Sequence, residues 1–251
     1  MNPFYFGPSD RPLFGLFTRA REPAPAAGAV LLCYPVGSEY MRAHRAFRQL
    51  NTLLNRAGFH VLRFDYSCTG DSAGQGVDAR VSTWIEDVGW AIEELQDTAM
   101  VDRVSLVGLR WGATLAALAA RGRDDVDQIV LWDPVVSGAA YLDDRLGTPR
   151  PTGVVGIEGY PFSDVLRAEM DEVDLRRDGT DLPAEISVMV AEDSKAYREY
   201  MDGLDTAGHR AGYRVVPAPG DWAQVDPFGD ALIPQDIIQA IIQQLSRGRA
   251  S

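Results

Sequence analysis

Residues 104 to 120 read Val-Ser-Leu-Val-Gly-Leu-Arg-Trp-Gly-Ala-Thr-Leu-Ala-Ala-Leu-Ala-Ala, with the pentapeptide Gly108-Leu109-Arg110-Trp111-Gly112 near their centre. The apolar residues before the pentapeptide predict a buried β-strand, and the small residues after it predict an α-helix. A sharp turn between the two needs glycine on both sides, because neighbouring backbone approaches closely there. We therefore expect Arg110 to lie at a tight turn, at the positive N-terminal end of the helix dipole.

Strand and helix patterns alternate along the rest of the chain. Short apolar runs predict buried parallel strands, and the runs between them predict helices. The alternation predicts a mostly parallel central sheet with helices on both faces, opened by a β-hairpin from residues 4–6 and 13–17. The expected strands are 29–34, 61–64, 104–107, 129–132, 186–190 and 213–216, and the expected helices are 41–57, 81–95, 111–120, 195–204 and 234–245. Gly58 is expected to end the first of these helices.

One segment interrupts this alternation. Residues 139–183 contain several prolines and glycines, followed by an expected helix at 162–173. Because the segment is inserted between two core strands, we expect it to form a small cap over the site. The length of the chain fits a single α/β domain that spans residues 1–251.

The composition argues against several classes of function. The formal net charge of −12 disfavours a general affinity for nucleic acid or an anionic membrane. Cys33 and Cys68 form neither a disulfide framework nor a metal-binding spacing, so we expect no metal and no cofactor. No signal-peptide pattern and no apolar run of membrane-spanning length is visible. A cytoplasmic protein without a membrane span is expected.

The predicted strand, turn and helix around Arg110 have the shape of the G-x-S-x-G nucleophile elbow of α/β-hydrolases, with arginine in place of serine. Arginine stays protonated and has no usable lone pair, so it cannot attack a carbonyl carbon. Two interpretations stay open. In one, Arg110 forms an internal ion pair with a nearby acid, such as Asp193, and closes the site. In the other, it lies in a pocket for a carboxylate or phosphate group.

Two acids follow late strands, where this fold places the acid of its catalytic triad. Asp193 follows the expected strand at 186–190, and Asp133 follows the expected strand at 129–132. Both are candidate catalytic acids. The alternative for each is a solvated loop carboxylate or a helix cap.

The histidine of the triad has no counterpart at its expected position. The three histidines of the chain are His44, His60 and His209. None of them follows the last expected strand, where Asp221 or Trp222 stands instead. His44 lies early in the helix at 41–57, so it either faces the mouth of the site or lies on an exposed helix face. Loss of both nucleophile and base points away from the standard acyl-enzyme mechanism.

Other groups beyond the strand ends could take part in chemistry. The backbone N–H of Trp111, with that of Val36 or Gly37, could form an oxyanion hole. The residues with a hydroxyl or thiol in such loops are Ser38, Cys68, Ser72 and Ser137. Each has a turn or capping role as its alternative, because no histidine partner is visible. Cys68 is chemically the most interesting, since a thiol needs less activation than an alcohol.

These motifs resemble those of a known family. Residues 65–72 resemble the D-x-x-G-x-G-x-S loop of serine-aminopeptidase-like α/β-hydrolases, with Cys68 in place of the first glycine of that loop. The elbow at 108–113 is more specifically similar to the hydrolase-like proteins associated with exosortase A systems. Residues 131–135 and 220–222 continue the likeness. The resemblance implies an α/β-hydrolase fold, and such proteins are called hydrolases mainly because of that fold.

Two kinds of function follow. In the first, the protein acts on an acyl, ester or thioester compound at a non-standard site, where Arg110 binds an anionic group and Asp193 or Asp133 orients a water or the substrate. In the second, it is a pseudoenzyme with a degenerate triad that binds a small acyl-type molecule, or a protein partner as a scaffold in a biosynthetic pathway. Whether it forms a homo-oligomer stays open. The expected binding residues are Arg110, Trp111, Val36, Gly37, Ser38, His44, Cys68 and Trp222.

Overall fold

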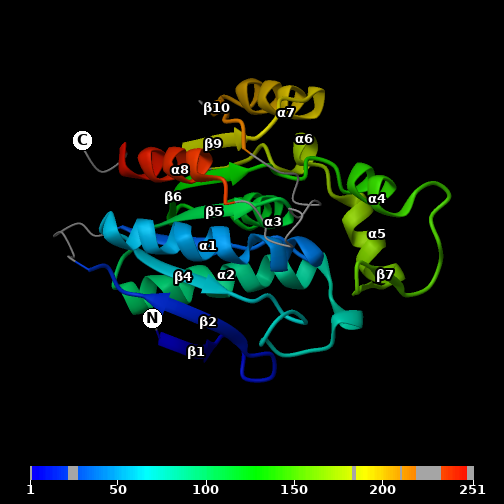
Figure 1. Cartoon of the computed structure of the whole chain (residues 1–251), viewed down its shortest axis with the longest axis horizontal. Coiled ribbons are helices and arrows are strands. Elements are labelled where there is room, and N and C mark those ends of the chain that lie inside the picture. The colour runs from blue at the N-terminus through cyan, green and yellow to red at the C-terminus, as the bar shows by residue number, and fades with distance from the viewer. Residues whose placement is uncertain (1, 22–27, 183–184, 210, 219–232, 248–251) are drawn as a thin grey trace.

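The computed structural model describes residues 2–21, 28–182, 185–209, 211–218 and 233–247. Within these ranges one sheet of eight strands has the order β1-β2-β4-β3-β5-β6-β9-β10 (Figure 1). The strands are β1 Asn2–Phe6, β2 Leu13–Thr18, β3 Ala29–Cys33, β4 His60–Phe64, β5 Val104–Leu109, β6 Val126–Trp132, β9 Glu185–Val190 and β10 Gly212–Val215. Strand β2 is antiparallel to β1 and β4, and the other pairs are parallel. The expected mostly parallel sheet is confirmed.

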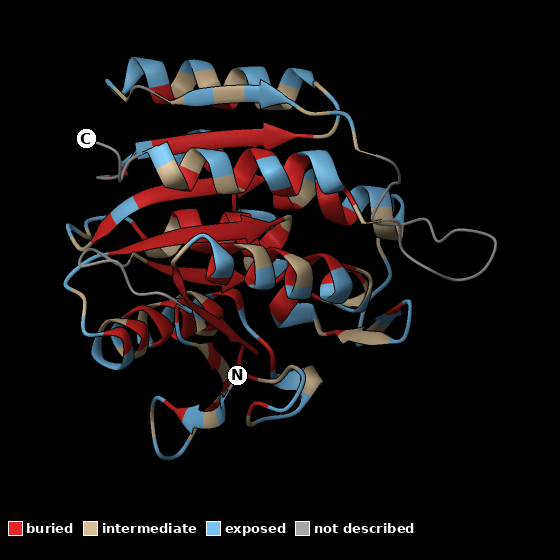
Figure 2. Ribbon diagram, turned by 60° about the vertical axis from the view of Figure 1, so that its left-hand side comes forward, coloured by how far each residue is buried: buried red, intermediate tan, exposed pale blue. Residues whose placement is uncertain are grey.

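Helices cover both faces of this sheet. The α-helices in the described ranges, which include some that lie beside the sheet, are α1 Ser38–Arg56, α2 Val81–Ala99, α3 Trp111–Ala119, α4 Gly138–Leu146, α5 Asp164–Glu172, α6 Leu175–Asp178, α7 Lys195–Thr206 and α8 Gln235–Arg247. On one face α1 lies beside α8, and on the other α2 lies beside α3 (Figures 1 and 2). None of the helices in the described ranges is both long enough and apolar enough to cross a bilayer.

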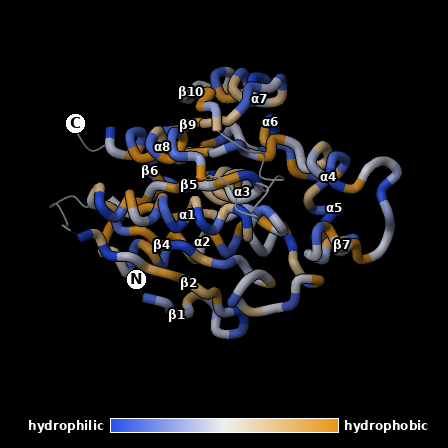
Figure 3. The backbone as a smooth tube through the Cα atoms, viewed as in Figure 1, coloured by the Kyte–Doolittle hydropathy of each residue, from blue (hydrophilic) through white to orange (hydrophobic). Residues whose placement is uncertain are grey.

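The central strands form the core because nearly every residue along them is apolar. Strands β3, β4 and β5 are buried from end to end, as Figure 2 shows in red. The hydrophobic colour of Figure 3 follows the same strands, while the outer turns of the helices are hydrophilic. Burial on both faces explains why these strands read as continuous apolar runs rather than as alternating ones.

Several element boundaries differ from those expected. Helix α1 begins three residues before the expected 41, at Ser38. Gly58 follows its end with φ 88°, in the left-handed conformation that a helix C-terminus favours. The expected helix at 162–173 was wrong at its start, since α5 begins at Asp164. The Ser163 hydroxyl caps it by accepting a hydrogen bond from the Leu166 N–H at 3.2 Å.

The segment between β6 and β9 lies beside the carboxyl ends of the parallel strands. Besides α4, α5 and α6, it contains a hairpin of β7 Val155–Ile157 and β8 Tyr160–Phe162, which the sequence pattern did not predict. Helices α4 and α5 pack together at one side of the sheet (Figure 1). That residues 139–183 act as a cap stays a prediction.

Candidate active site

The turn between β5 and α3 has the geometry that its two glycines predicted. A Cβ atom on Gly108 would lie 2.4 Å from the Gly112 carbonyl oxygen, and one on Gly112 would lie 2.2 Å from the carbonyl oxygens of Cys33 and Tyr34. Arg110 between them has φ 54° and ψ −123°. Such a conformation is strained for any residue with a side chain and costs about 1–3 kcal/mol. The turn therefore keeps the strained backbone of a nucleophile elbow, although its central side chain is not a nucleophile.

The guanidinium of Arg110 is held by groups from several elements. Its Nε donates to Glu39 Oε1 at 3.2 Å, and its Nη1 donates to the backbone carbonyl of Asp133 at 3.3 Å. Burial raises the pKa of Tyr197, on α7, and the nearby charge of Arg110 opposes that rise. The ring centroid of Tyr141, on α4, lies 5.9 Å from the guanidinium carbon, within cation–π range. These contacts fix the side chain, but 23% of it stays exposed.

Glu39 is the acid that compensates Arg110, and the sequence reasoning missed it. Its side chain is 1% exposed, and its Oε1 also accepts a hydrogen bond from Arg145 Nη2, on α4, at 2.7 Å. Within the described residues, its Oε2 has no hydrogen-bond partner. Burial by itself would lower the pKa of Arg110, but Glu39 and weaker neighbours outweigh that effect and raise it. One buried carboxylate thus joins two guanidiniums, and Arg110 stays charged.

A signal for Glu39 existed in the sequence. It is an acidic residue in the first turn of the helix that follows the loop at 35–37. Because β3 and β5 are neighbours in the sheet, with Cys33 opposite Gly108, the segments that follow them meet at the same edge. That adjacency is tertiary, so the residue type alone could not select Glu39 from the other acids.

Asp193 does not pair with Arg110, so the ion pair considered for these two residues is absent from the structure. The Asp193 carboxylate accepts hydrogen bonds from Arg198 Nε at 2.9 Å and from the Tyr213 hydroxyl at 2.6 Å. Arg198 and then Tyr213 lower the pKa of Asp193 below its usual value. The carboxylate is therefore held as an anion by groups outside the elbow.

Asp133, the second candidate acid, lies next to the elbow in a strained turn with φ 42°. Its Oδ1 accepts a hydrogen bond from the Ala191 N–H at 2.7 Å, and its own N–H donates to the Met189 carbonyl at 2.9 Å. These bonds join the ends of β6 and β9. A structural role for Asp133 is thus visible, and a catalytic one stays a prediction.

A cavity of about 800 Å³ opens above Arg110 at the carboxyl ends of β5, β6 and β9. Its apolar and aromatic lining is Pro134, Val135, Val136, Ala140, Tyr141, Ala191, Ala196, Tyr197 and Ala218, and its polar lining is Arg110, Asp133, Ser137, Asp144, Glu192, Asp193 and Ser194. Both candidate acids and Arg110 thus share one cavity. Its volume is within the range of small-molecule sites.

Two loops at this edge offer free backbone donors. Gly37, with φ 64°, precedes α1, and Trp111 opens α3. Among the described residues, no acceptor is found for the backbone N–H of Trp111, Val36 or Gly37. Since the preceding strands β3 and β5 are paired, these donors follow neighbouring strand ends. None of these three residues lines the cavity, and Trp111 and Val36 are buried, so the oxyanion hole expected from the sequence stays a prediction.

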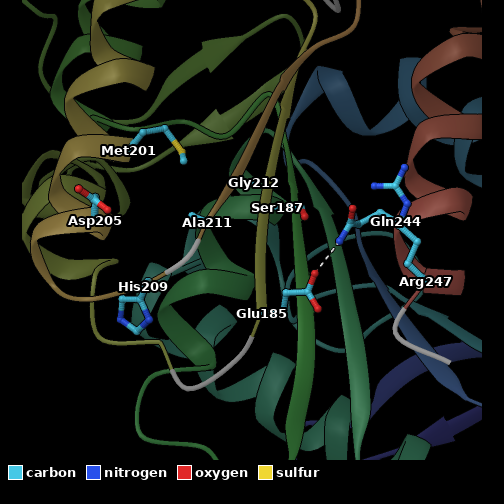
Figure 4. Close-up of a pocket in the computed structure, with 9 residues that line it drawn as sticks. All are labelled: Glu185, Ser187, Met201, Asp205, His209, Ala211, Gly212, Gln244 and Arg247. Carbon is cyan, nitrogen blue, oxygen red and sulfur yellow. Dashed lines mark hydrogen bonds between the residues drawn. The ribbon is translucent and has the colours of Figure 1, made fainter. Parts of the chain in front are cut away.

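No histidine of the chain lines this cavity. His44 is exposed on α1 with its ring centroid 6.4 Å from that of Tyr34, and burial followed by the charge of Arg63 lowers its pKa. His60 is buried in β4, where its Nδ1 accepts from the Ala20 N–H at 3.4 Å. His209 lines a separate hollow of about 530 Å³ at the amino ends of β9 and β10 (Figure 4). That hollow lies at the opposite edge of the sheet from Arg110.

The hydroxyl and thiol candidates have structural roles. Ser72 Oγ donates to the Asp65 carbonyl at 2.5 Å, Ser137 Oγ accepts from the Ala140 N–H at 3.3 Å to cap α4, and Ser38 is the first residue of α1. Trp222 and Asp221 lie outside the described residues.

Cys68 stands at the position where the expected loop pattern has its first glycine. It has φ 65°, the conformation in which a glycine carries no penalty. Its N–H donates to the Ala73 carbonyl at 2.8 Å, which closes the loop. Burial is the main cause that raises the pKa of its thiol, which disfavours a thiolate nucleophile. A thiol nucleophile here is therefore less attractive than the sequence indicated.

Solved structures share this architecture over the whole chain. Est1E from Butyrivibrio proteoclasticus superimposes with a TM-score of 0.77 and 11% identity, covering 100% of both chains. The proline iminopeptidase of Mycobacterium smegmatis gives 0.70 and 14% identity, covering 98% of each chain. The chain has the α/β-hydrolase fold. A third structure with the α/β-hydrolase fold, the Pyrococcus furiosus esterase Pf2001, gives 0.68 and 14% identity, covering 98% of this chain and 90% of its own.

The comparisons reach no finer grouping. No family model matches the chain, and no curated protein matches it. At 11–14% identity the structural likeness shows the fold and not the activity. It shows the α/β-hydrolase fold alone, so membership of the superfamily and the resemblance to the exosortase A group stay predictions.

Proposed function

We propose that the protein binds a small acyl compound in the cavity above Arg110 and does not cleave it through an acyl-enzyme intermediate. One observation carries the proposal: a guanidinium occupies the nucleophile position of the elbow, at the floor of a cavity that no histidine lines. In the standard mechanism a nucleophile attacks the acyl carbon, and a general base accepts the proton of that nucleophile. Neither group is present at its expected position here.

The contacts of Arg110 support a binding role. Its guanidinium is fixed by Glu39 and by the Asp133 carbonyl, which use Nε and Nη1. Arginine has five N–H donors, so donors remain for an oxygen of a ligand. The exposed part of the side chain lies in the cavity. A carbonyl or carboxyl oxygen of an acyl group is the ligand atom that fits such donors.

The walls support an acyl chain or an aromatic ring. Tyr141 and Tyr197 line the cavity beside Pro134, Val135 and Val136. A related structure shows ferulic acid bound to Est1E, a protein of the same fold with a TM-score of 0.72 and 13% identity. Aromatic and aliphatic acids with their methyl esters are therefore suitable first probes.

Hydrolysis at a non-standard site is the second candidate. The observation that favours it is that the backbone N–H groups of Trp111, Val36 and Gly37 have no acceptor among the described residues, so they could stabilise an oxyanion. Asp193 or Asp133 would then orient water. A role as a scaffold in a biosynthetic pathway is also part of the proposal. A cytoplasmic location is a further part of it and is consistent with the free thiols of Cys33 and Cys68.

The test measures binding and hydrolysis side by side. Purified protein is titrated by calorimetry with benzoic, ferulic and octanoic acids and their methyl esters, and product release from the esters is followed. We expect saturable binding of at least one probe with no turnover above background, and loss of binding in Arg110→Ala. Arg103→Ala removes an exposed arginine that pairs with Asp127, and should bind normally. Turnover that Asp133→Asn or Asp193→Asn abolishes would favour the second candidate instead.

A further inference from the structure

We propose that Glu39 is the specificity-determining residue of this site, and that it makes the site select uncharged acyl compounds (esters, thioesters or amides) over free carboxylates. The inference rests on the proposed function and names the ligand class for the same cavity. Glu39 would act through Arg110 and is therefore a positioning residue, because it does not line the cavity itself.

The first step concerns the charge that a ligand meets at the floor. Arg110 has already formed an ion pair with Glu39, at 3.2 Å between Nε and Oε1. A second carboxylate, brought by a ligand, would have to share Arg110 with the Glu39 carboxylate and would lie near that buried anion. Like charges at such range repel strongly where water is scarce. A neutral carbonyl oxygen uses the same N–H donors without that repulsion.

The second step concerns the walls. Among the described residues, four carboxylate side chains line the cavity, Asp133, Asp144, Glu192 and Asp193, against one guanidinium. Arg198 and Tyr213 pair with Asp193, and Asp144, which is 81% exposed, lies 3.7 Å from Arg145 Nε. Even with such pairing and solvation, the potential along the walls opposes an entering anion. The walls and the floor therefore favour the same uncharged ligand class.

The third step concerns what keeps Glu39 beside Arg110. Arg145 Nη2 donates to the same Oε1 at 2.7 Å, and its guanidinium carbon lies 5.2 Å from the Tyr141 ring centroid. Arg145 also approaches Glu158, at 3.9 Å, which in turn pairs with Arg42 at 2.9 Å. Glu39 is thus anchored from α4, so a ligand carboxylate cannot displace it from Arg110 without breaking a second ion pair.

The test compares benzoic acid with methyl benzoate, and octanoic acid with methyl octanoate, by calorimetry at pH 7. We expect the unmodified protein to bind an ester at least about tenfold more tightly than its acid. Glu39→Gln keeps an oxygen acceptor but removes the charge, and should strengthen acid binding about tenfold or more with little change for the ester. Glu39→Asp keeps the charge and should keep the preference for the ester, which separates charge from packing.

A matched control removes a neighbouring carboxylate that does not touch Arg110. Glu158→Gln should leave the ratio of acid to ester affinity within about twofold, since its partners are Arg42 and Arg145. An equal gain of acid binding in Glu158→Gln would overturn the role of Glu39. Tighter binding of the acid than of the ester by the unmodified protein would overturn the ligand class while leaving the proposed function intact. If no probe binds, the proposed function fails and this inference fails with it.

Discussion

Arg110 and Glu39 are 71 residues apart in sequence, yet Arg110 Nε lies 3.2 Å from Glu39 Oε1. One follows β5 and the other follows β3, and these two strands are neighbours in the sheet. A cation at the nucleophile position is thus matched by an acid from the adjacent loop. An ion pair therefore lies at the position where the elbow of α/β-hydrolases carries its nucleophile.

Glu39→Ala should destabilise the protein by about 3 kcal/mol or more, because it leaves Arg110 and Arg145 buried without their carboxylate. Urea unfolding followed by circular dichroism measures the change. Glu199→Ala removes an acid from exposed pairs with Arg176 and Lys195, and should cost far less, because exposed ion pairs contribute little to stability. Equal losses in the two variants would contradict the importance of the buried pair.

Gly112→Ala should cost about 3 kcal/mol or more, since its Cβ would lie 2.2 Å from two backbone carbonyl oxygens that cannot move without shifting β3. Thermal unfolding measures the loss. Gly156→Ala is the matched control, because no atom lies within 4 Å of a Cβ placed there. A Gly112→Ala protein as stable as Gly156→Ala would show that the elbow is more open than described.

Arg110→Ser should not produce an esterase. It restores the hydroxyl of the elbow, but no histidine lines the cavity to accept the serine proton. The expected rate of p-nitrophenyl acetate hydrolysis equals that of Arg110→Ala within about twofold. A rate in the serine variant that exceeds the alanine variant by about a hundredfold would reveal a general base outside the described residues.

Asp87 should make stability depend on pH. Burial is the main cause that raises its pKa from 3.8 to about 6, although hydrogen bonds from Ser67 oppose it. The folded state therefore holds this proton more tightly than the unfolded chain. Its contribution to the free energy of unfolding is fully present below about pH 4 and is lost as pH rises through about 6.

Comparison with Asp87→Asn isolates this effect. Between pH 5 and pH 7 the unmodified protein should lose about 1 kcal/mol more stability than the variant, which has no proton to release. Urea unfolding at the two values measures the difference. Parallel changes in both proteins would mean that Asp87 titrates in its ordinary range.

The two thiols should differ in reactivity. Cys33 is fully buried, and burial raises the pKa of its thiol to about 12. Cys68 is half-buried, so it should be the first to react with iodoacetamide in the native protein at pH 8. Mass spectrometry of the labelled peptides checks this order, and labelling of Cys33 before unfolding would contradict it.

The sequence alone determined the layered fold and the elbow. Apolar runs such as 104–107 become strands because burial on both faces requires apolar residues throughout, and the pairing of Gly108 with Gly112 follows from a local steric need. Both constraints act between residues that are close in sequence, so they can be predicted from the local sequence pattern. The β7–β8 hairpin escaped prediction, since its strands have only three residues each.

Only the tertiary structure decided the partner of Arg110. Asp193 and Glu39 are both acids near strand ends, and nothing in the local pattern separates them. Strand order places Glu39 beside the elbow, while Arg198 and Tyr213 engage Asp193. The strength of an ion pair depends on distance and burial, and both are set by how distant segments pack. The sequence therefore predicted a cation at the elbow, and the fold determined how that cation is compensated.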